Sequence, residues 1–325
     1  MIKGEEDNIL IKATAGTIQR LLGQGKVTCV DLVKYYTKRT IEYGVPLNLV
    51  TELMYDRALK LAEQRDSVLK KLIPAWSKLT AEEISHKMRE LGQLFGVPMS
   101  TKECFEFENM DSTLGASYHC FKPEKEDGLV VNLLINAGAV PFVKSNVPQL
   151  LLINETNNYI FGQAKNPWDP RRTPGGSSGG EAGLICLGCS PIGIGSDGGG
   201  SIRIPALYCG IFGFRPTGQR FTFIGHKPPS DYIPRNVKGA VGPLAKSIED
   251  CERMAHALQD QQLLIPSDCL LSPQPWKYDQ TFLQPTKKLR IGFIRGLKVT
   301  NLNTLVFLTF SFSSQFSPRK ELLMR

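Results

Sequence analysis

Two glycine-rich segments decide the fold of this chain: Thr173-Pro-Gly-Gly-Ser-Ser-Gly-Gly-Glu181 and Gly195-Ser-Asp-Gly-Gly-Gly-Ser-Ile-Arg203. A low-complexity linker would not carry the apolar residues found among these glycines, which include Leu184, Ile185, Ile192, Ile194 and Ile202. Glycine within apolar structure indicates backbone conformations or close approaches that a side chain would block. We therefore expect a functional site between residues 162 and 217.

The flanking sequence predicts an α/β fold. Residues 95–100 form a short apolar run and predict a strand. Asp127 is expected to cap a helix that ends near Gly138, and residues 139–143 predict a second strand. A strand, a helix and a strand joined by short connections are typical of a mixed β-sheet covered by helices.

Helix-start signatures recur outside this region. A capping residue is expected to accept a hydrogen bond from a backbone N–H of the first turn, and a Glu three residues later completes a capping box. The candidates are Thr28, Thr80 with Glu83, and Ser247 with Asp250. Residues 14–92 are therefore predicted to be mainly helical.

Charge and hydropathy exclude several classes of protein. Lys and Arg number 39 against 31 Asp and Glu, which gives a net charge of +8, and the basic residues are scattered. This pattern favours a general attraction to anionic surfaces such as a membrane and argues against nucleic-acid binding. No signal peptide is expected, and the apolar run 305–312 is far shorter than the ~20 residues of a spanning helix. We expect a cytoplasmic protein, or one peripheral on an intracellular membrane.

Common cofactor and metal motifs are weak or absent. Gly193, Gly195 and Gly198 spell the dinucleotide-binding pattern G-x-G-x-x-G, but no acidic residue lies between Asp197 and Asp231 to hold a ribose. No histidine lies in the glycine-rich block, since the four are His86, His119, His226 and His256. We predict neither a metal nor an organic cofactor.

Serines and one lysine remain as candidate chemistry. Ser177 and Ser178 lie between glycine pairs, and Ser201 follows three glycines whose N–H groups could converge on an oxyanion. Lys102 closely follows the predicted strand, and burial there would favour its neutral form, which can act as a base without histidine. Glycine turns with a surface lysine remain the alternative on composition alone.

In order and spacing, these three segments resemble the amidase signature family of serine hydrolases. Within the family, further stretches look most like the animal fatty acid amide hydrolases: Asn146-Val-Pro-Gln149, Phe161-Gly-Gln163, Asn166-Pro-Trp168 and Gly210-Ile-Phe-Gly-Phe-Arg-Pro-Thr217. The resemblance runs from about residue 14 to 294. It implies hydrolysis of a carboxylic amide, with a fatty acid amide as the preferred expectation and a small lipid amide as the binding partner.

The resemblance also implies roles for particular residues. Ser201 matches the acylated nucleophile, Ser177 the bridging serine that follows a cis peptide bond, and Lys102 the base. Leu151 occupies a position that contacts substrate in the fatty-acid relatives. The oxyanion loop matches the N–H groups of Gly198, Gly199, Gly200 and Ser201. The residues alone do not separate Ser177 from Ser178.

The resemblance implies an N-terminal helical region over 1–93 on the same domain, a catalytic core over 94–295 and a divergent tail over 296–325. We expect the fold to lack its C-terminal strands. A homodimer is a further expectation. Two other functions stay open: a glutamine-hydrolysing subunit of an amidotransferase, and an inactive truncated form that acts by binding alone.

Overall fold

The structure is a computed structural model that describes residues 5–228 and 238–260. These residues lie in the first of two units into which the chain divides, Met1–Trp276, the second being Lys277–Arg325. The tail predicted from residue 296, and its boundary with the core, therefore fall outside the described residues.

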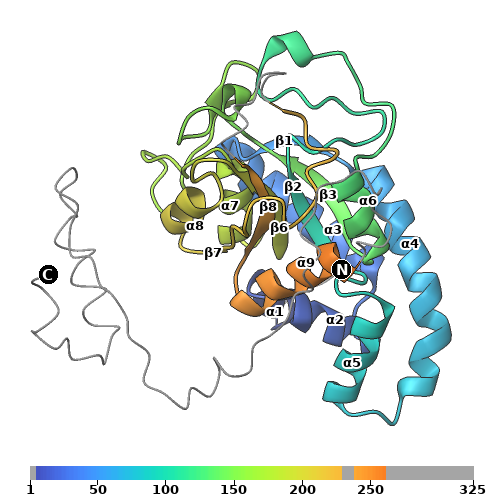
Figure 1. Ribbon diagram of the computed structural model, residues 1–325. Coiled ribbons are helices and arrows are strands. Elements are labelled where there is room, and N and C mark those ends of the chain that lie inside the picture. Colours follow the sequence, from blue (N-terminus) through green and yellow to red (C-terminus); the bar gives the residue numbers. More distant parts are fainter. Residues whose placement is uncertain (1–4, 229–237, 261–325) are drawn as a thin grey trace, which may run out of the picture. The chain divides into compact units, whose positions relative to one another are not determined.

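A mixed six-stranded sheet forms the centre of the described part of the chain (Figure 1), with strand order β1-β3-β2-β6-β8-β7. Its strands are β1 Val50–Leu53, β2 Pro98–Lys102, β3 Val140–Ser145, β6 Ile192–Asp197, β7 Phe212–Gly213 and β8 Ala240–Ala245. Strand β2 pairs in parallel with both β3 and β6, whereas β1 and β8 add antiparallel pairs outside them. A separate antiparallel pair joins β4 Asn157–Asn158 to β5 Gly162–Gln163.

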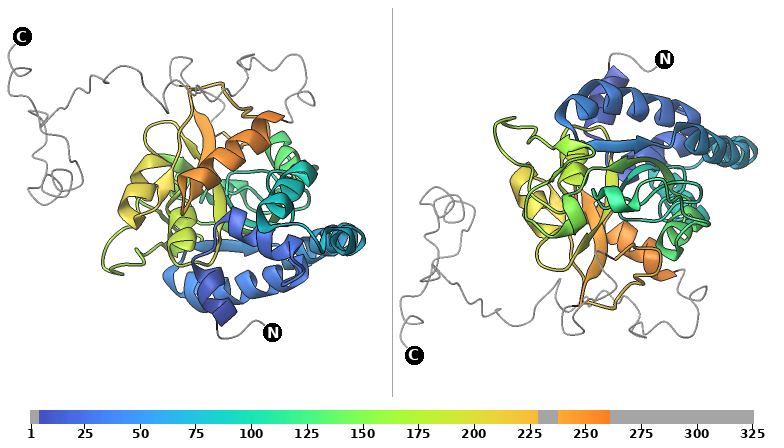
Figure 2. Two further views of the ribbon diagram at one scale, coloured as in Figure 1. Left: turned by 90° about the horizontal axis from the view of Figure 1, so that it is seen from below. Right: turned by 90° about the horizontal axis from the view of Figure 1, so that it is seen from above.

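Helices cover both faces of this sheet. The longer ones are α1 Glu5–Ile11, α2 Ala15–Gly23, α3 Cys29–Arg39, α4 Tyr55–Leu72, α5 Ala81–Leu91, α6 Leu129–Asn136, α7 Gly179–Cys186, α8 Arg203–Cys209 and α9 Ile248–Asp260. Single turns are η1 Thr40–Gly44, η2 Val45–Leu47, η3 Ile73–Trp76, η4 Ser117–His119 and η5 Gln149–Leu151. Figure 2 shows most of the blue N-terminal helices on one side of the sheet and the orange α9 on the other. The predicted mixed sheet covered by helices is confirmed.

Three of the four predicted helix caps are confirmed. The Thr28 hydroxyl accepts from the N–H of Asp31, and Thr80 with Glu83 forms the full capping box. The Ser247 hydroxyl accepts from the N–H of Asp250 at 3.1 Å. These signals were readable because each joins residues only three positions apart.

Three sequence predictions need correction. The strand predicted at 95–100 begins at Pro98 and ends at Lys102. Asp127 does not cap α6, because its carboxylate instead accepts from the Glu108 N–H at 2.9 Å and pairs with Arg57. The segment predicted as helical also contains the edge strand β1, whose four residues give no periodic pattern of their own.

Close packing of α7 on β6 brings the two glycine-rich segments together. A Cβ on Gly193 of β6 would collide with the Glu181 carboxyl group on α7, which Ser100 and Ser145 hold in place, so glycine is favoured there. The helix therefore sits directly on the strand, and the chain entering α7 meets the chain leaving β6. No helix in the described ranges is both long and apolar enough to cross a membrane.

Candidate active site

Lys102 is the last residue of β2, at the end of the strand rather than beyond it. Its side chain is completely buried. The ammonium nitrogen Nζ lies 2.7 Å from Oγ of Ser177, 2.9 Å from Oγ of Ser196 and 3.2 Å from the Ser196 carbonyl oxygen. The carboxyl ends of two neighbouring strands, β2 and β6, thus meet the start of α7 at one nitrogen atom.

The buried position of Lys102 changes its acidity. Burial lowers the pKa of Lys102, while electrostatic interactions with Cys104, Asp197, Glu181 and Glu103 act in the opposite direction. Water that would solvate an ammonium ion is excluded, so the neutral amine gains relative to the charged form. A neutral lysine in contact with a hydroxyl has the electronic requirements of a general base.

The structure separates the two adjacent serines that the sequence could not. Ser177 follows a cis peptide bond from Gly176, and its Oγ is the atom that contacts Lys102. Ser178 turns away, and its Oγ lies 3.5 Å from the Ser196 carbonyl oxygen. The backbone N–H of Ser178 donates to the carbonyl of Ser201 at 3.1 Å, which fixes the two glycine-rich segments against each other.

Ser201 lies half-buried just before α8. Among the described residues, its hydroxyl makes no hydrogen bond, so the structure does not join Ser201 Oγ to Ser177. The preceding Gly198 and Gly199 are exposed, and a Cβ built on either would meet nothing within 4 Å. The backbone of Gly198 and Gly199 is therefore open to solvent, on the same loop as Ser201.

One of the four predicted oxyanion donors is already engaged. The N–H of Gly200 donates to Oδ1 of Asp197 at 2.6 Å and is not free for a ligand in this arrangement. Gly200 has a φ of +122°, a conformation that favours glycine. Within the described ranges, the N–H groups of Gly198, Gly199 and Ser201 donate to no protein atom, so three of the four predicted donors remain available.

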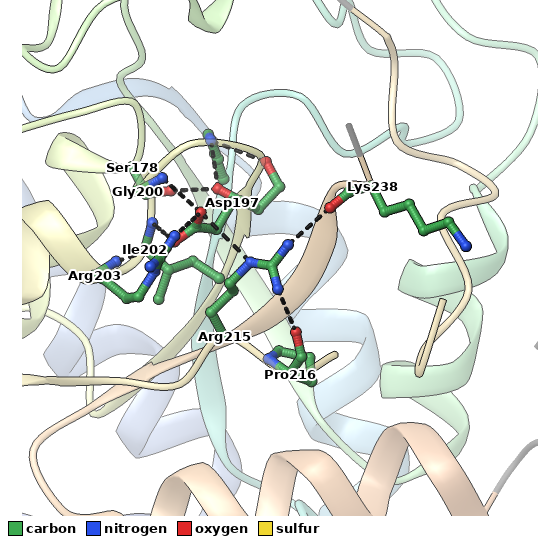
Figure 3. Close-up of polar contacts among 10 residues, drawn as sticks. Ser178, Asp197, Gly200, Ile202, Arg203, Arg215, Pro216 and Lys238 are labelled. Atoms are coloured by element: carbon green, nitrogen blue, oxygen red, sulfur yellow. Dashed lines mark hydrogen bonds and ion pairs between the residues drawn. The ribbon is translucent and has the colours of Figure 1, made fainter. Parts of the chain in front are cut away.

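Asp197 organises the loop that carries these donors (Figure 3). Its carboxylate accepts a two-point contact from Arg203, at 2.9 Å from Nε and 3.0 Å from Nη2, and also the N–H of Ile202 at 3.1 Å. Nε of Arg215 lies 3.8 Å from Oδ1 of Asp197, and the two Nη groups of Arg215 donate to the backbone carbonyls of Pro216 and Lys238. The carboxylate thus links β6 to the first turn of α8.

The Asp197 carboxylate is ionised at neutral pH. Burial acts to raise the pKa of Asp197, but the hydrogen bonds from Arg203 and from the N–H groups of Gly200 and Ile202 outweigh it and lower the pKa to about 2. A carboxylate that accepts several N–H groups stays ionised. The loop is therefore organised around a permanent negative charge.

Leu151 lies on a different segment from these groups. It ends the short turn η5 and is partly buried against the main core. Leu150 and Leu151 both adopt positive φ values, 53° and 60°. Such conformations are strained for leucine and persist where surrounding structure enforces them. The predicted substrate contact of Leu151 stays a prediction.

Sequence reasoning missed two residues next to Lys102. In the sequence Ser196 stands only as part of a glycine-rich segment, and His226 lies outside the glycine-rich block. The structure puts Nε2 of His226 2.8 Å from Oγ of Ser196, and thus one residue away from Lys102. Ser196 carries a readable signal, since it directly precedes Asp197, the last residue of β6. His226 lies 30 residues further on and carries none.

A family model described as Amidase matches residues 31–309. The chain belongs to the amidase signature family. A pig protein named fatty-acid amide hydrolase 1 is 43% identical over 204 residues, which are 62% of this chain and 34% of the relative. Amidase 2 of Gibberella moniliformis is 35% identical over 283 residues, which are 87% of this chain and 51% of the relative.

Solved structures agree with the family assignment. A fatty acid amide hydrolase structure superposes with a TM-score of 0.73 at 29% identity, over 85% of this chain and 46% of that one. A structure titled as an amidase gives a TM-score of 0.64 at 29% identity, over 76% of this chain and 51% of that one. The chain thus spans about half the length of the relatives that it matches.

Proposed function

We propose that this chain carries the catalytic centre of a serine hydrolase that cleaves carboxylic amides, with fatty acid amides as the substrate class. The single observation that supports this most directly is the hydrogen bond between Ser177 and the completely buried amine of Lys102. A buried amine in contact with a hydroxyl, beside a glycine loop with free N–H groups, has the parts of an acyl-transfer site.

The proposed reaction begins with proton transfer. Neutral Lys102 takes the proton of Ser177, which takes the proton of Ser201, and Ser201 Oγ attacks the amide carbonyl carbon. The N–H groups of Gly198, Gly199 and Ser201 stabilise the negative charge that develops on the carbonyl oxygen. The proton returns through Ser177 to the amide nitrogen, so the amine leaves in its neutral form. Water then hydrolyses the acyl-enzyme.

The proposed mechanism requires one movement. The Ser201 hydroxyl has to turn toward Ser177, because the two form no hydrogen bond in this structure. Catalytic hydrogen bonds are often long before substrate binds and shorten in the reactive complex.

The substrate class rests on the relatives and on the chain's own residues. Two of the proteins that it resembles are named fatty acid amide hydrolases, from pig and from Caenorhabditis elegans. Leu150 and Leu151 supply apolar surface on the segment that the family resemblance assigns to substrate. Other relatives are named only as amidases, so acyl-chain length is the property to measure.

Labelling with a fluorophosphonate tests the proposal. This reagent phosphorylates activated serines, and peptide mass spectrometry locates the modified residue. We expect modification of Ser201 in the wild type and none in Ser201→Ala, with circular dichroism showing that both are folded. Folded wild type that is unlabelled, or labelled at another serine, would contradict the proposal. Hydrolysis rates for amides of two to twenty acyl carbons, with glutamine included, then define the substrate.

A further inference from the structure

His226 is a buried histidine that the proposed mechanism does not use. Its ring lies between Phe105 and Phe223, with centroid separations of 5.5 Å and 4.6 Å. Nε2 is 2.8 Å from Oγ of Ser196, and that oxygen is 2.9 Å from Nζ of Lys102. Within the described part of the chain, Nδ1 has no hydrogen-bond partner. The ring's side-chain hydrogen bond is therefore directed through Ser196 toward the candidate base.

Counting protons at Lys102 limits what Ser196 can do. A neutral amine has two N–H donors and one lone pair, and Nζ has three oxygen neighbours. The Ser196 carbonyl can only accept, so it takes one N–H. The other N–H and the lone pair are shared between the hydroxyls of Ser177 and Ser196. If Ser196 donates its proton to Nζ, the lone pair is occupied and cannot take the proton of Ser177.

The tautomer of His226 decides between these two arrangements. When the proton is on Nδ1, Nε2 accepts from the Ser196 hydroxyl, and Ser196 Oγ then accepts an N–H from Lys102. The lone pair of Nζ is left for Ser177. When the proton is on Nε2, the ring donates to Ser196, whose own proton is left for Nζ or for Sγ of Cys104, 3.9 Å away. The lone pair of Nζ is a stronger acceptor than the thiol sulfur, so the Ser196 proton turns to Nζ and blocks it.

We propose that His226, as the Nδ1–H tautomer, is a positioning residue that holds the Ser196 hydroxyl so that the lone pair of Lys102 faces Ser177. This inference rests on the proposed function, because it assigns a supporting part to the same base. It extends the candidate centre to a four-residue chain of His226, Ser196, Lys102 and Ser177.

The electrostatics around these four residues are compatible with the positioning role of His226. Burial, and then the nearby charge of Lys102, lower the pKa of His226 to about 3, whereas backbone groups of His226 and Lys227 favour a proton on the ring. The ring therefore stays neutral at working pH and acts by hydrogen bonding. Lys102 is also faced by Cys104, Asp197, Glu181 and Glu103, which are the same in every variant proposed below.

Two substitutions at His226 separate hydrogen bonding from packing. His226→Phe keeps an aromatic ring between Phe105 and Phe223 but cannot accept from Ser196. His226→Gln can present its side-chain oxygen near the position of Nε2. We expect the maximum rate of fluorophosphonate labelling at Ser201 to fall about tenfold in His226→Phe and to recover substantially in His226→Gln. Phe223→Leu is the packing control and should retain the wild-type pH profile.

The pH profile gives the sharper readout. In His226→Phe the Ser196 hydroxyl turns to the lone pair of neutral Lys102, which stabilises the neutral amine. The midpoint of the alkaline rise in labelling should therefore move to lower pH while the plateau falls. A simple packing defect admits water, stabilises the ammonium ion and moves the midpoint to higher pH. An unmoved midpoint, or one moved to higher pH, would overturn the inference.

A double-mutant cycle and a spectrum complete the test. In a Ser196→Ala background, His226→Phe should have no further effect on the profile, because the intermediate hydroxyl is gone. Undiminished effects in that background would contradict the proposed route. Independently of any activity, ¹⁵N NMR of the wild-type ring should show protonated Nδ1 and unprotonated Nε2, and the reverse would refute the inference. Unlabelled wild type with the expected tautomer would instead refute the proposed function alone.

Discussion

At the scale of single residues, the adjacent serines 177 and 178 offer a matched pair. Only Ser177 contacts Lys102, whereas Ser178 reaches the Ser196 carbonyl. We predict that Ser177→Ala lowers the fluorophosphonate labelling rate at Ser201 by at least ~100-fold, the range of lost acid–base catalysis. Ser178→Ala, which removes the same atom one position away, should cost much less. Equal losses in the two variants would assign the relay to neither serine.

The lowered pKa of Lys102 gives a second prediction. Reaction requires the neutral amine, so labelling at Ser201 should rise with pH and level off below 10.5, the ordinary pKa of lysine. Lys102→Met has a stem of similar length and no proton to exchange. We predict that it labels at a low rate without this rise. A Lys102→Met profile that keeps the wild-type rise would place the base elsewhere.

At this scale, the sequence could predict those site residues that stand in short local motifs. Ser177, Ser201 and Lys102 stand in motifs, and the residues alone placed them as candidates. Which of the two adjacent hydroxyls faces Lys102 depends on the path of the backbone between Gly176 and α7. The residue types alone do not determine that path. The contact of His226 with Ser196 depends on tertiary folding alone, so no sequence pattern could predict it.

At the scale of elements, Glu181 joins α7 to two strands. Its carboxyl group contacts the hydroxyl of Ser100 on β2 and lies 2.5 Å from the hydroxyl of Ser145 on β3. Burial raises the pKa of Glu181 to about 8, although both hydroxyls and Lys102 act to lower it. The folded protein therefore keeps this carboxyl protonated at neutral pH, when the unfolded chain has released the proton.

The sign of the resulting stability change follows from proton binding. Between 4.5, the ordinary pKa, and about 8, the folded state binds more protons than the unfolded state. The contribution of Glu181 to the free energy of unfolding is thus full below 4.5 and is lost as pH rises to about 8. Glu181→Gln should flatten this dependence in urea titrations at pH 5.5 and 8. Glu82→Gln, on the exposed face of α5, is the control and should leave it unchanged.

Element boundaries show where sequence patterns fail. The caps at Thr28, Thr80 and Ser247 were predictable because capping is completed within one turn. Asp127 is also a residue of a capping type just before a helix, yet its carboxylate accepts from the Glu108 N–H and pairs with Arg57 instead. A cap prediction assumes that no distant partner competes, and only the folded chain shows whether one does.

At the scale of the whole molecule, the family resemblance predicted the fold, whereas local patterns did not predict the strand order. The edge strand β1 pairs with β3 some ninety residues later, with Val50 opposite Ser145. The four residues of β1 have no periodic pattern, so the sequence cannot predict this pairing. The parallel placement of β2 between β3 and β6 is what brings Lys102 to the glycine-rich segments, and it arises from long-range packing.

One contact joins helices from opposite ends of the described chain. Asp250 of α9 is buried, and its Oδ2 accepts from the N–H of Ala15, the first residue of α2, at 2.9 Å. Next to it, Arg253 donates to the side-chain oxygen of Gln19 at 2.9 Å. A carboxylate at a helix start pairs with a free N–H and with the positive end of the helix dipole. This contact spans 235 positions in sequence.

Removing the Asp250 carboxylate should therefore destabilise the fold as a whole. In Asp250→Ala the Ala15 N–H is buried without a partner, which costs ~1–3 kcal/mol of unfolding free energy. Asp250→Asn keeps a side-chain oxygen and should recover most of the loss. Glu249→Ala, one position away on the exposed side of α9, should stay within ~0.5 kcal/mol of wild type. Because the contact ties both ends of the described chain to one core, thermal unfolding should shift as one transition. An early separate transition in Asp250→Ala would show instead that α9 and α2 form a unit apart from the sheet.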